Sequence, residues 1–287
     1  MAGNRVLRIG LTQWDASTHI ERNVKYACSA ITSCAEDGAD VVLLPENGLM
    51  LGTNAEMREA AFTPDSELLH KLEEHIAKCG VVTVVGGLKY RIGEHTTNSA
   101  LVYGADGTLR GRYDKLHLFD ANIGGQSFEA STVEAPGERL TILEVAGIKI
   151  GLLICYDIRF PEASRKLAAA GAEVLLYPAA FLEKTGSAHW QTLLQSRAIE
   201  NLAYVVASTT VASDDPSVDR GFRTWGHAMA VGPWGEVLAD LGSAPYATRV
   251  LELDMAEVER TRTILPVLHG VRPARIYDAT PLSIAVS

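Results

Sequence analysis

Four short, largely apolar runs recur along the chain at the length of a strand. They are VVLL (41–44), VVTVV (81–85), GLLI (151–154) and EVLLY (173–177). Continuous apolar runs of this kind are typical of strands that are covered on both faces. Since segments with helical periodicity lie between them, the pattern predicts an α/β protein.

Helical spacing and hairpin turns both occur between these runs. The segments with helical spacing are 18–38, 66–78, 188–200 and 255–265, and a short helix is expected after Pro161. Thr18 and Glu21 have the form of a capping box at the start of the first helix. The turn GADG (104–107) and a second turn at Ala146 indicate hairpins. Hairpins among alternating strands and helices predict a mixed sheet, and the even composition predicts one domain over residues 1–287.

Composition narrows the functional classes. The 287 residues, 47% of them hydrophobic, can bury a large core. A net charge of −9 without a run of lysines and arginines argues against nucleic acid as a partner. No apolar stretch approaches the roughly 20 residues of a membrane span, so we expect a soluble, cytoplasmic protein. The cysteines have no paired spacing, which favours a reducing compartment; they are Cys28, Cys34, Cys79 and Cys155.

Reactive side chains follow three of the predicted strands at the point where each strand ends. Glu46 follows VVLLP, Lys115 follows the strand that ends near Tyr113, and Cys155 follows GLLI. Ligands of open α/β sheets bind at the carboxyl ends of strands, so these three residues form a candidate site.

This set of side chains suffices to hydrolyse a carbon–nitrogen bond. A free thiol has a pKa of about 8.5, so a nucleophilic Cys155 needs a cation or a base nearby. Lys115 could favour the thiolate and hold the oxyanion that forms when sulfur attacks a carbonyl or nitrile carbon. Glu46 could take the thiol proton, pass it to the leaving amine and later activate water against the thioester.

Each residue taken alone also has an ordinary structural explanation, as a solvated acid, a surface lysine or a packing thiol. His117, His189 and His227 lack the spacing of metal ligands, and we expect structural hydrogen bonds from them. Asp157 and Arg159 are expected to brace the turn after the cysteine. Nucleotide-binding and serine-hydrolase motifs are missing from the sequence, so no metal and no cofactor is predicted.

Three motifs carry a family resemblance: LLPEN around Glu46, YDKLHLFD around Lys115 and GLLICYDIRFPE around Cys155. In this order and at these separations they resemble the nitrilase superfamily of carbon–nitrogen hydrolases along nearly the whole chain. The resemblance implies a four-layer αββα sandwich with two mixed β-sheets, usually paired into a homodimer. It also implies that the backbone amide of Tyr156 helps Lys115 to stabilise the oxyanion.

Members of the superfamily carry a second glutamate between the lysine and the cysteine. In QSFEASTVEAPGE the match is Glu129, which we take as the fourth catalytic residue. Its spacing to Pro136 is one residue longer than usual, and counting back from the proline places the position on Ala130. Glu134 is a less favoured substitute.

The segments TGSAHW and AIEN resemble the amidase branch that includes omega-amidases and deaminated-glutathione amidases. This implies a small-molecule substrate, a carboxylate-bearing compound whose terminal amide is cleaved through a Cys155 thioester with release of ammonia. Such a substrate needs another cation, for which Arg159, Arg197 and Lys184 are available.

Other functions stay open on the sequence. A nitrilase or an N-carbamoyl amino acid hydrolase would use the same three groups. A non-catalytic scaffold or an ammonia-supplying partner protein is the alternative from another class, and the intact catalytic set argues against it. The polar segment 213–222 is expected to be a surface loop that is either a lid or disordered.

Overall fold

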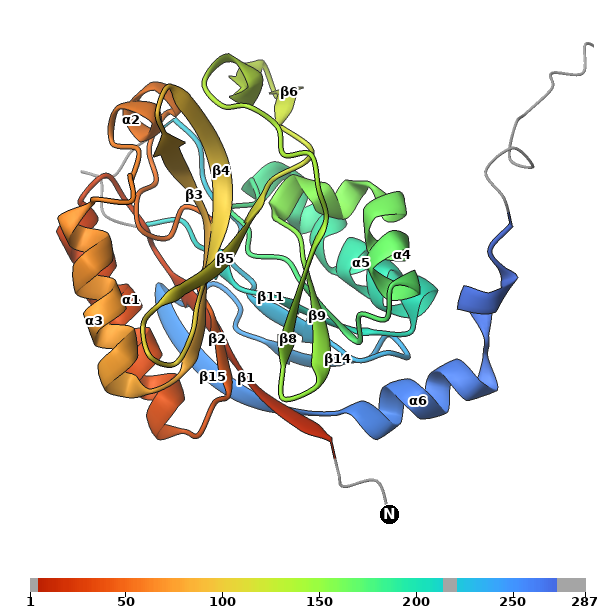
Figure 1. The fold of residues 1–287 in the computed structure, drawn as a ribbon. Helices are drawn as coiled ribbons and strands as arrows, with labels where there is room; N and C mark the ends of the chain where they lie inside the picture. Colours follow the sequence, from red (N-terminus) through yellow and green to blue (C-terminus); the bar gives the residue numbers. More distant parts are fainter. Residues whose placement is uncertain (1–4, 214–220, 273–287) are drawn as a thin grey trace, which may run out of the picture.

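The computed structural model describes residues 5–213 and 221–272. Two β-sheets pack face to face, and helices cover the outer face of each (Figure 1). The layers therefore run helix, sheet, sheet, helix, which confirms the αββα sandwich expected from the motifs.

The first sheet has seven strands among the described residues, with β12, β1, β2 and β3 parallel and the other three antiparallel to their neighbours. Its strands are β1 (Val6–Trp14), β2 (Val41–Leu43), β3 (Val82–Ile92), β4 (His95–Tyr103), β5 (Leu109–Asp114), β12 (Thr209–Thr210) and β15 (Tyr246–Asp254). The mixed pairing arises because hairpins add β4 and β5 to a parallel centre.

The second sheet has six strands in the described part of the chain and is also mixed, with β9, β10 and β11 parallel at its centre. Its strands are β8 (Thr141–Val145), β9 (Ile148–Leu152), β10 (Val174–Leu176), β11 (Tyr204–Ala207), β13 (Met229–Val231) and β14 (Val237–Asp240). The hairpin predicted at Ala146 joins β8 to β9, and Ala146 and Gly147 both have positive φ, as such tight turns require.

Two helices lie on each outer face (Figure 1). The first sheet is covered by α1 (Ile20–Glu36) and α3 (Glu67–Cys79), and the second by α4 (Pro161–Ala169) and α5 (Glu183–Asn201). The other helical elements are α2 (Asn54–Glu59), η1 (Ala130–Thr132), η2 (Cys155–Arg159), α6 (Met255–Ile264) and η4 (Val267–Gly270). None of the helices in the described residues is both long and apolar enough to cross a bilayer.

The strand β2 shows why the apolar runs are continuous. Val41 and Leu43 pack in the cluster that holds side chains from both sheets, whereas Val42 and Leu44 pack in the cluster under α1 and α3. Successive side chains of a strand point to opposite faces, so a strand buried on both faces needs apolar residues at every position.

Two local features differ from the sequence prediction. Helix α1 starts after His19 without a side-chain cap, so Thr18 and Glu21 form no capping box. The chain before α1 is held instead by Asn23, whose Nδ2 donates to the carbonyl of Ser17 at 2.7 Å. A capping box does form at Thr53 and Glu56, at the start of α2, which the sequence reading missed.

A second difference is a small hairpin that follows the lysine motif. It consists of β6 (Asp120–Ile123) and β7 (Gln126–Glu129), which pair only with each other among the described strands. This hairpin stands apart from both main sheets (Figure 1).

Candidate active site

The three predicted reactive residues come together at one cavity. Glu46 follows β2, Lys115 follows β5 and Cys155 follows β9, and all three line a cavity of about 350 Å³. Glu46 and Lys115 are each 3% exposed and Cys155 is 9% exposed. Strand ends from both sheets therefore build the floor of this cavity, as the sequence predicted.

Cys155 occupies a strained turn. Its φ of 45° lies in the left-handed region, which non-glycine residues adopt at a cost of roughly 1–3 kcal/mol. The turn is held by a hydrogen bond of 3.0 Å from Cys155 N–H to the carbonyl of Pro178, and η2 starts at the cysteine itself. Strain of this kind persists only where the surroundings hold it, and it aims the sulfur away from the strand into the cavity.

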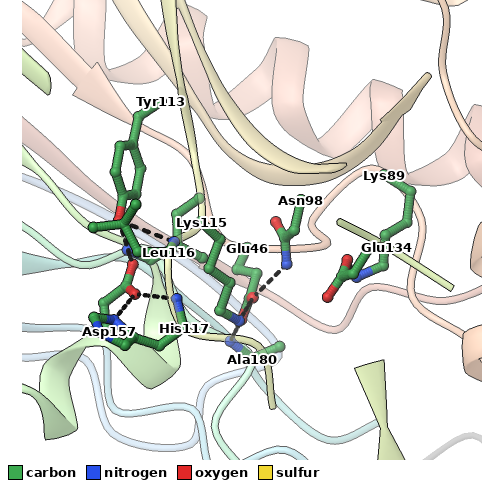
Figure 2. A network of polar contacts seen from close by, with 11 residues as sticks. Glu46, Lys89, Asn98, Tyr113, Lys115, Leu116, His117, Glu134, Asp157 and Ala180 are labelled. Carbon is green, nitrogen blue, oxygen red and sulfur yellow. Dashed lines mark hydrogen bonds and ion pairs between the residues drawn. The ribbon is translucent and has the colours of Figure 1, made fainter. Parts of the chain in front are cut away.

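Glu46 is held by three donors (Figure 2). Lys115 Nζ donates to Oε1 at 2.8 Å and Asn98 Nδ2 donates to the same oxygen at 3.0 Å. The backbone N–H of Ala180 donates to Oε2 at 2.8 Å. These contacts fix the carboxylate and leave capacity on Oε2 for a proton from Cys155.

Two consecutive glycines of β3 make this arrangement possible. A Cβ on Gly86 would lie 2.3 Å from the carbonyl oxygen of Leu44, and a Cβ on Gly87 would lie 2.1 Å from Asn98 Oδ1. Both distances are far below van der Waals contact, so a larger residue would push β3 away from the site. The same approach lets Asn47 N–H donate to the carbonyl of Gly87 at 2.6 Å.

Glu46 and Lys115 keep each other charged. Burial alone would raise the pKa of Glu46, but the Lys115 ammonium, together with Cys155 and Lys89, holds this pKa below its usual value. Burial alone would lower the pKa of Lys115, but the Glu46 carboxylate holds it above its usual value. The site therefore contains a carboxylate base and an ammonium cation at neutral pH.

The thiol of Cys155 is protonated at neutral pH. Burial raises its pKa, and the Glu46 carboxylate raises it further. Lys115 and the Ala180 amide act in the opposite direction without outweighing these two causes. The sequence had suggested that Lys115 would supply a thiolate, whereas this balance favours transfer of the proton to Glu46 as sulfur attacks.

The second carboxylate of the cavity comes from Glu134, and the expected placement of Glu129 is wrong. Glu129 ends β7, is exposed, and accepts a hydrogen bond of 2.9 Å from Ser127 Oγ. Its neighbours Phe128 and Ala130 both line the cavity, whereas Glu129 does not. The position counted back from the proline, Ala130, is thus the inward one, but it carries no carboxylate.

Glu134 forms a buried ion pair with Lys89 of β3, and each residue is 6% exposed. Figure 2 shows this pair on the side of Asn98 away from Lys115. Glu134 helps to raise the pKa of Lys115, and Lys89 helps to lower that of Glu46, so the two pairs form one cluster of alternating charge. Lys89 was missed on the sequence, although a lysine inside the apolar strand VVGGLKY signals a buried partner.

Comparisons with known proteins show which family the chain belongs to. Residues 8–263 match the family model described as carbon-nitrogen hydrolase. The chain belongs to the carbon-nitrogen hydrolase family. The human omega-amidase NIT2 is 34% identical over 266 residues, which are 92% of this chain and 95% of the relative. The chloroplastic omega-amidase of Arabidopsis thaliana is 37% identical over 280 residues, 94% of this chain and 73% of the relative.

Solved carbon-nitrogen hydrolases share the fold. The Caenorhabditis elegans NitFhit protein has a TM-score of 0.85 at 32% identity, over 97% of this chain and 67% of that chain. Saccharomyces cerevisiae Nit3, of the nitrilase superfamily, has a TM-score of 0.81 at 26% identity, over 92% of this chain and 95% of that chain. These matches confirm the nitrilase superfamily and identify an amidase-type hydrolase of carbon–nitrogen bonds other than peptide bonds.

The three candidate substrate-binding cations lie in different places in this carbon-nitrogen hydrolase. Arg159 lines the cavity, with its guanidinium 5.9 Å from the ring centre of Tyr156 and 5.0 Å from that of Phe181. Within the described residues Arg159 has no carboxylate partner. Lys184 lines a neighbouring hollow that shares Phe128 with the cavity.

Arg197 does not reach the cavity, so its proposed contact with substrate is wrong. It is 5% exposed, its Nε donates to the carbonyl of Ile158 at 2.7 Å, and its Nη1 lies 2.9 Å from Glu200. The guanidinium therefore supports the turn of η2 from α5. Arg197 is not among the residues that line the cavity.

The histidines make the structural contacts expected of them. His117 binds Asp157, His189 lies 3.4 Å from Arg159, and His227 lies 3.0 Å from Asp240. In the described residues no group of three His, Cys, Asp or Glu side chains is arranged to hold a metal ion. Of the expected surface loop, residues 214–220 lie outside the described residues, while Phe222 at its end lines the cavity.

Proposed function

We propose that this carbon-nitrogen hydrolase cleaves the terminal amide of a small carboxylate-bearing compound through a Cys155 thioester and releases ammonia. The observation that carries the proposal is that a carboxylate base, an ammonium and a thiol line one cavity. The names of the omega-amidase relatives support an amide at the end of the substrate. A glutamate variant of the Nesterenkonia sp. AN1 amidase carries the acetamide moiety of fluoroacetamide on its active-site cysteine. That amidase is 25% identical to this chain, with a TM-score of 0.74 over 94% of this chain and 97% of that one.

In the first half of the reaction, the sulfur of Cys155 attacks the amide carbon while its proton passes to Glu46. The negative charge that develops on the amide oxygen is stabilised by the Lys115 ammonium, and we assign the backbone N–H of Tyr156 at the start of η2 to the same oxygen. Glu46 then gives the proton to the amine as the carbon–nitrogen bond breaks. Ammonia leaves and the acyl group stays on sulfur.

In the second half, Glu46 takes a proton from a water molecule that attacks the thioester carbon. The carbon–sulfur bond breaks, the carboxylic acid product forms, and the proton returns to the sulfur of Cys155. Glu46 acts as a base in both halves and Lys115 remains charged throughout. Both roles fit the buried pair, in which the pKa of Glu46 is lowered and the pKa of Lys115 is raised.

The carboxylate of the substrate is assigned to Arg159. Glu46 neutralises Lys115 and Glu134 neutralises Lys89, so among the described cavity residues Arg159 is the cation without a carboxylate partner. A guanidinium offers a planar pair of donors that fits a carboxylate. A cavity of about 350 Å³ accepts a compound with a short chain between the amide and this carboxylate.

The test is ammonia release by the purified chain from a matched panel. The panel contains half-amides of short dicarboxylic acids, neutral amides of the same length, nitriles and N-carbamoyl amino acids. We expect the half-amides to be hydrolysed fastest, the Cys155→Ala variant to be inactive, and a Cys28→Ala control to match wild type. Fastest turnover of nitriles or carbamoyl compounds would reassign the substrate, and equal release by Cys155→Ala would overturn the nucleophile.

We also propose that the protein is a cytoplasmic homodimer. Its four cysteines are free and have no paired spacing, which favours a reducing compartment. Large apolar side chains are exposed where the turn after β13 packs on α5: Ile199 at 48%, Trp234 at 56% and Val237 at 39%. Exposed apolar groups gathered at one place are typical of association surfaces. Sedimentation velocity of wild type and Trp234→Asp tests this, with a monomeric wild type contradicting it.

A further inference from the structure

A fully buried carboxylate two residues after the nucleophile accepts four hydrogen bonds. Asp157 Oδ1 accepts from the backbone N–H of His117 at 3.0 Å and from its ring Nδ1 at 2.7 Å. Oδ2 accepts from the Tyr113 hydroxyl at 2.8 Å and from the backbone N–H of Ile154 at 2.9 Å. Asp157 is 0% exposed and no lysine or arginine of the described residues pairs with it.

These donors come from two different catalytic segments. Tyr113 and His117 stand two residues before and two residues after Lys115, so Asp157 holds the lysine segment from both sides (Figure 2). Ile154 directly precedes Cys155 and follows β9 of the other sheet. The main chain of Lys115 is fixed as well, because its N–H donates to the carbonyl of Asn98 at 2.8 Å.

We infer that Asp157 is a positioning residue that sets the place of the Lys115 ammonium relative to the Cys155 sulfur. One rigid carboxylate joins the turn that strains the cysteine to the segment that carries the lysine. Stabilisation of an oxyanion depends on a donor already in place, and a misplacement of about 1 Å can cost about 10²-fold in rate. The inference rests on the proposed function only in the role that it gives to Lys115.

If Asp157 only stabilised the fold, a different set of hydrogen bonds would be expected. The bond from Ile154 N–H closes the turn of η2 by itself, so a purely local brace needs neither Tyr113 nor His117. Both reach Asp157 from across the sheet interface, 44 and 40 residues away in sequence. Loss of either bond should therefore move Lys115 while the turn remains closed.

The experiment uses Tyr113→Phe and His117→Phe in the full chain. The second change keeps a ring to stack on Phe160, whose ring centre lies 3.6 Å from that of His117. For each variant the rate of Cys155 alkylation by iodoacetamide is measured against pH, together with kcat and KM for the best amide. We expect alkylation to need a higher pH, kcat to fall about 10-fold and KM to change less than twofold.

Tyr204→Phe is the matched control, since it removes a buried hydroxyl bond to the carbonyl of Asp254 far from the site. If Tyr113→Phe and His117→Phe behave like this control in alkylation and kcat, and differ only in melting temperature, the inference is overturned. Alkylation needs no substrate, so the comparison stands even if wild type releases no ammonia and the proposed function fails.

Discussion

The floor and the rim of the active-site cavity are built from different kinds of residue. The floor consists of charged and polar side chains at strand ends, nearly all of them buried and bonded to one another. The rim consists of half-buried aromatic rings on loops and on the β6–β7 hairpin, such as Phe119 and Phe128, whose ring centres are 5.4 Å apart. In the proposed function the floor carries out the reaction chemistry, and we propose that the rim and Arg159 determine which molecule reaches it.

This division predicts that changes in the floor act on kcat and stability, and that changes at the rim act on KM. A buried charge without its partner costs several kcal/mol, whereas a half-exposed ring loses only part of its contact area. The predictions below test this difference between floor and rim, in order of decreasing expected effect.

Glu46→Gln should have the largest effect. Its amide cannot take the thiol proton or activate water, so kcat should fall by at least about 10³-fold while KM stays within a few-fold. Steady-state ammonia release measures this, and intact mass spectrometry should show any acyl group left on Cys155. A loss that appears in KM alone would place Glu46 at the rim and break the comparison.

The activity of wild type should persist to acidic pH. Because the pKa of Glu46 is lowered from the usual 4.5, its carboxylate form, and the stability that its ion pair contributes, are complete above pH 4.5 and are lost as pH falls through the folded pKa. The acid limb of kcat/KM should therefore have its midpoint below pH 4.5. Melting temperatures at each pH separate titration from unfolding, and a midpoint near neutrality would refute the assignment.

Lys89→Met should destabilise the fold by about 3–5 kcal/mol, because Glu134 then becomes an unpaired buried charge. The double variant Lys89→Met with Glu134→Leu should regain most of this, since the two apolar side chains can pack together. Urea unfolding of wild type, the two single variants and the double variant gives the coupling energy. Additive losses would mean that the pair is not a unit of the floor.

Sequence reasoning was successful for residues whose place depends on one strand. Glu46 and Cys155 each follow an apolar run, Lys115 follows another predicted strand, and the ends of these strands line one cavity. The apolar runs predicted an α/β protein with a mixed sheet, and the family resemblance implied the order of sheets and helices. Predicted strand ends were thus enough to bring Glu46, Lys115 and Cys155 together.

Sequence reasoning was wrong, or made no prediction, where the position of a residue depends on two segments of the chain. Lys89 and Glu134 are 45 residues apart, and nothing local pairs them. Glu129 was assigned because it is the nearest acid to the motif spacing, but a shift of one residue along an extended chain reverses the direction of its side chain. The hairpin that sets this direction was itself not predicted, since its strands pair with neither main sheet.

Arg159→Met should have a smaller and more selective effect. A charged hydrogen bond contributes about 1.5–3 kcal/mol, so KM for a half-amide should rise about 10- to 100-fold. KM for a neutral amide of the same length should not change, because it makes no contact with the guanidinium. Lys184→Met, which removes a cation from the neighbouring hollow, is the matched control, and equal rises in KM for both amides would assign Arg159 to packing.

Glu129→Gln should have the smallest effect, and its partner in the comparison is Glu134→Gln. Glu129 is exposed and, among the contacts described, its side chain is bonded only to Ser127, so its variant should stay within about 0.5 kcal/mol of wild type in stability and within twofold in kcat. Glu134→Gln leaves Lys89 as an unpaired buried cation and weakens the field at Lys115, so both quantities should fall. A larger loss of stability and kcat in Glu129→Gln than in Glu134→Gln would contradict this prediction. It would mean that the hairpin is shifted by one residue in solution, with Glu129 in the cavity in place of Ala130.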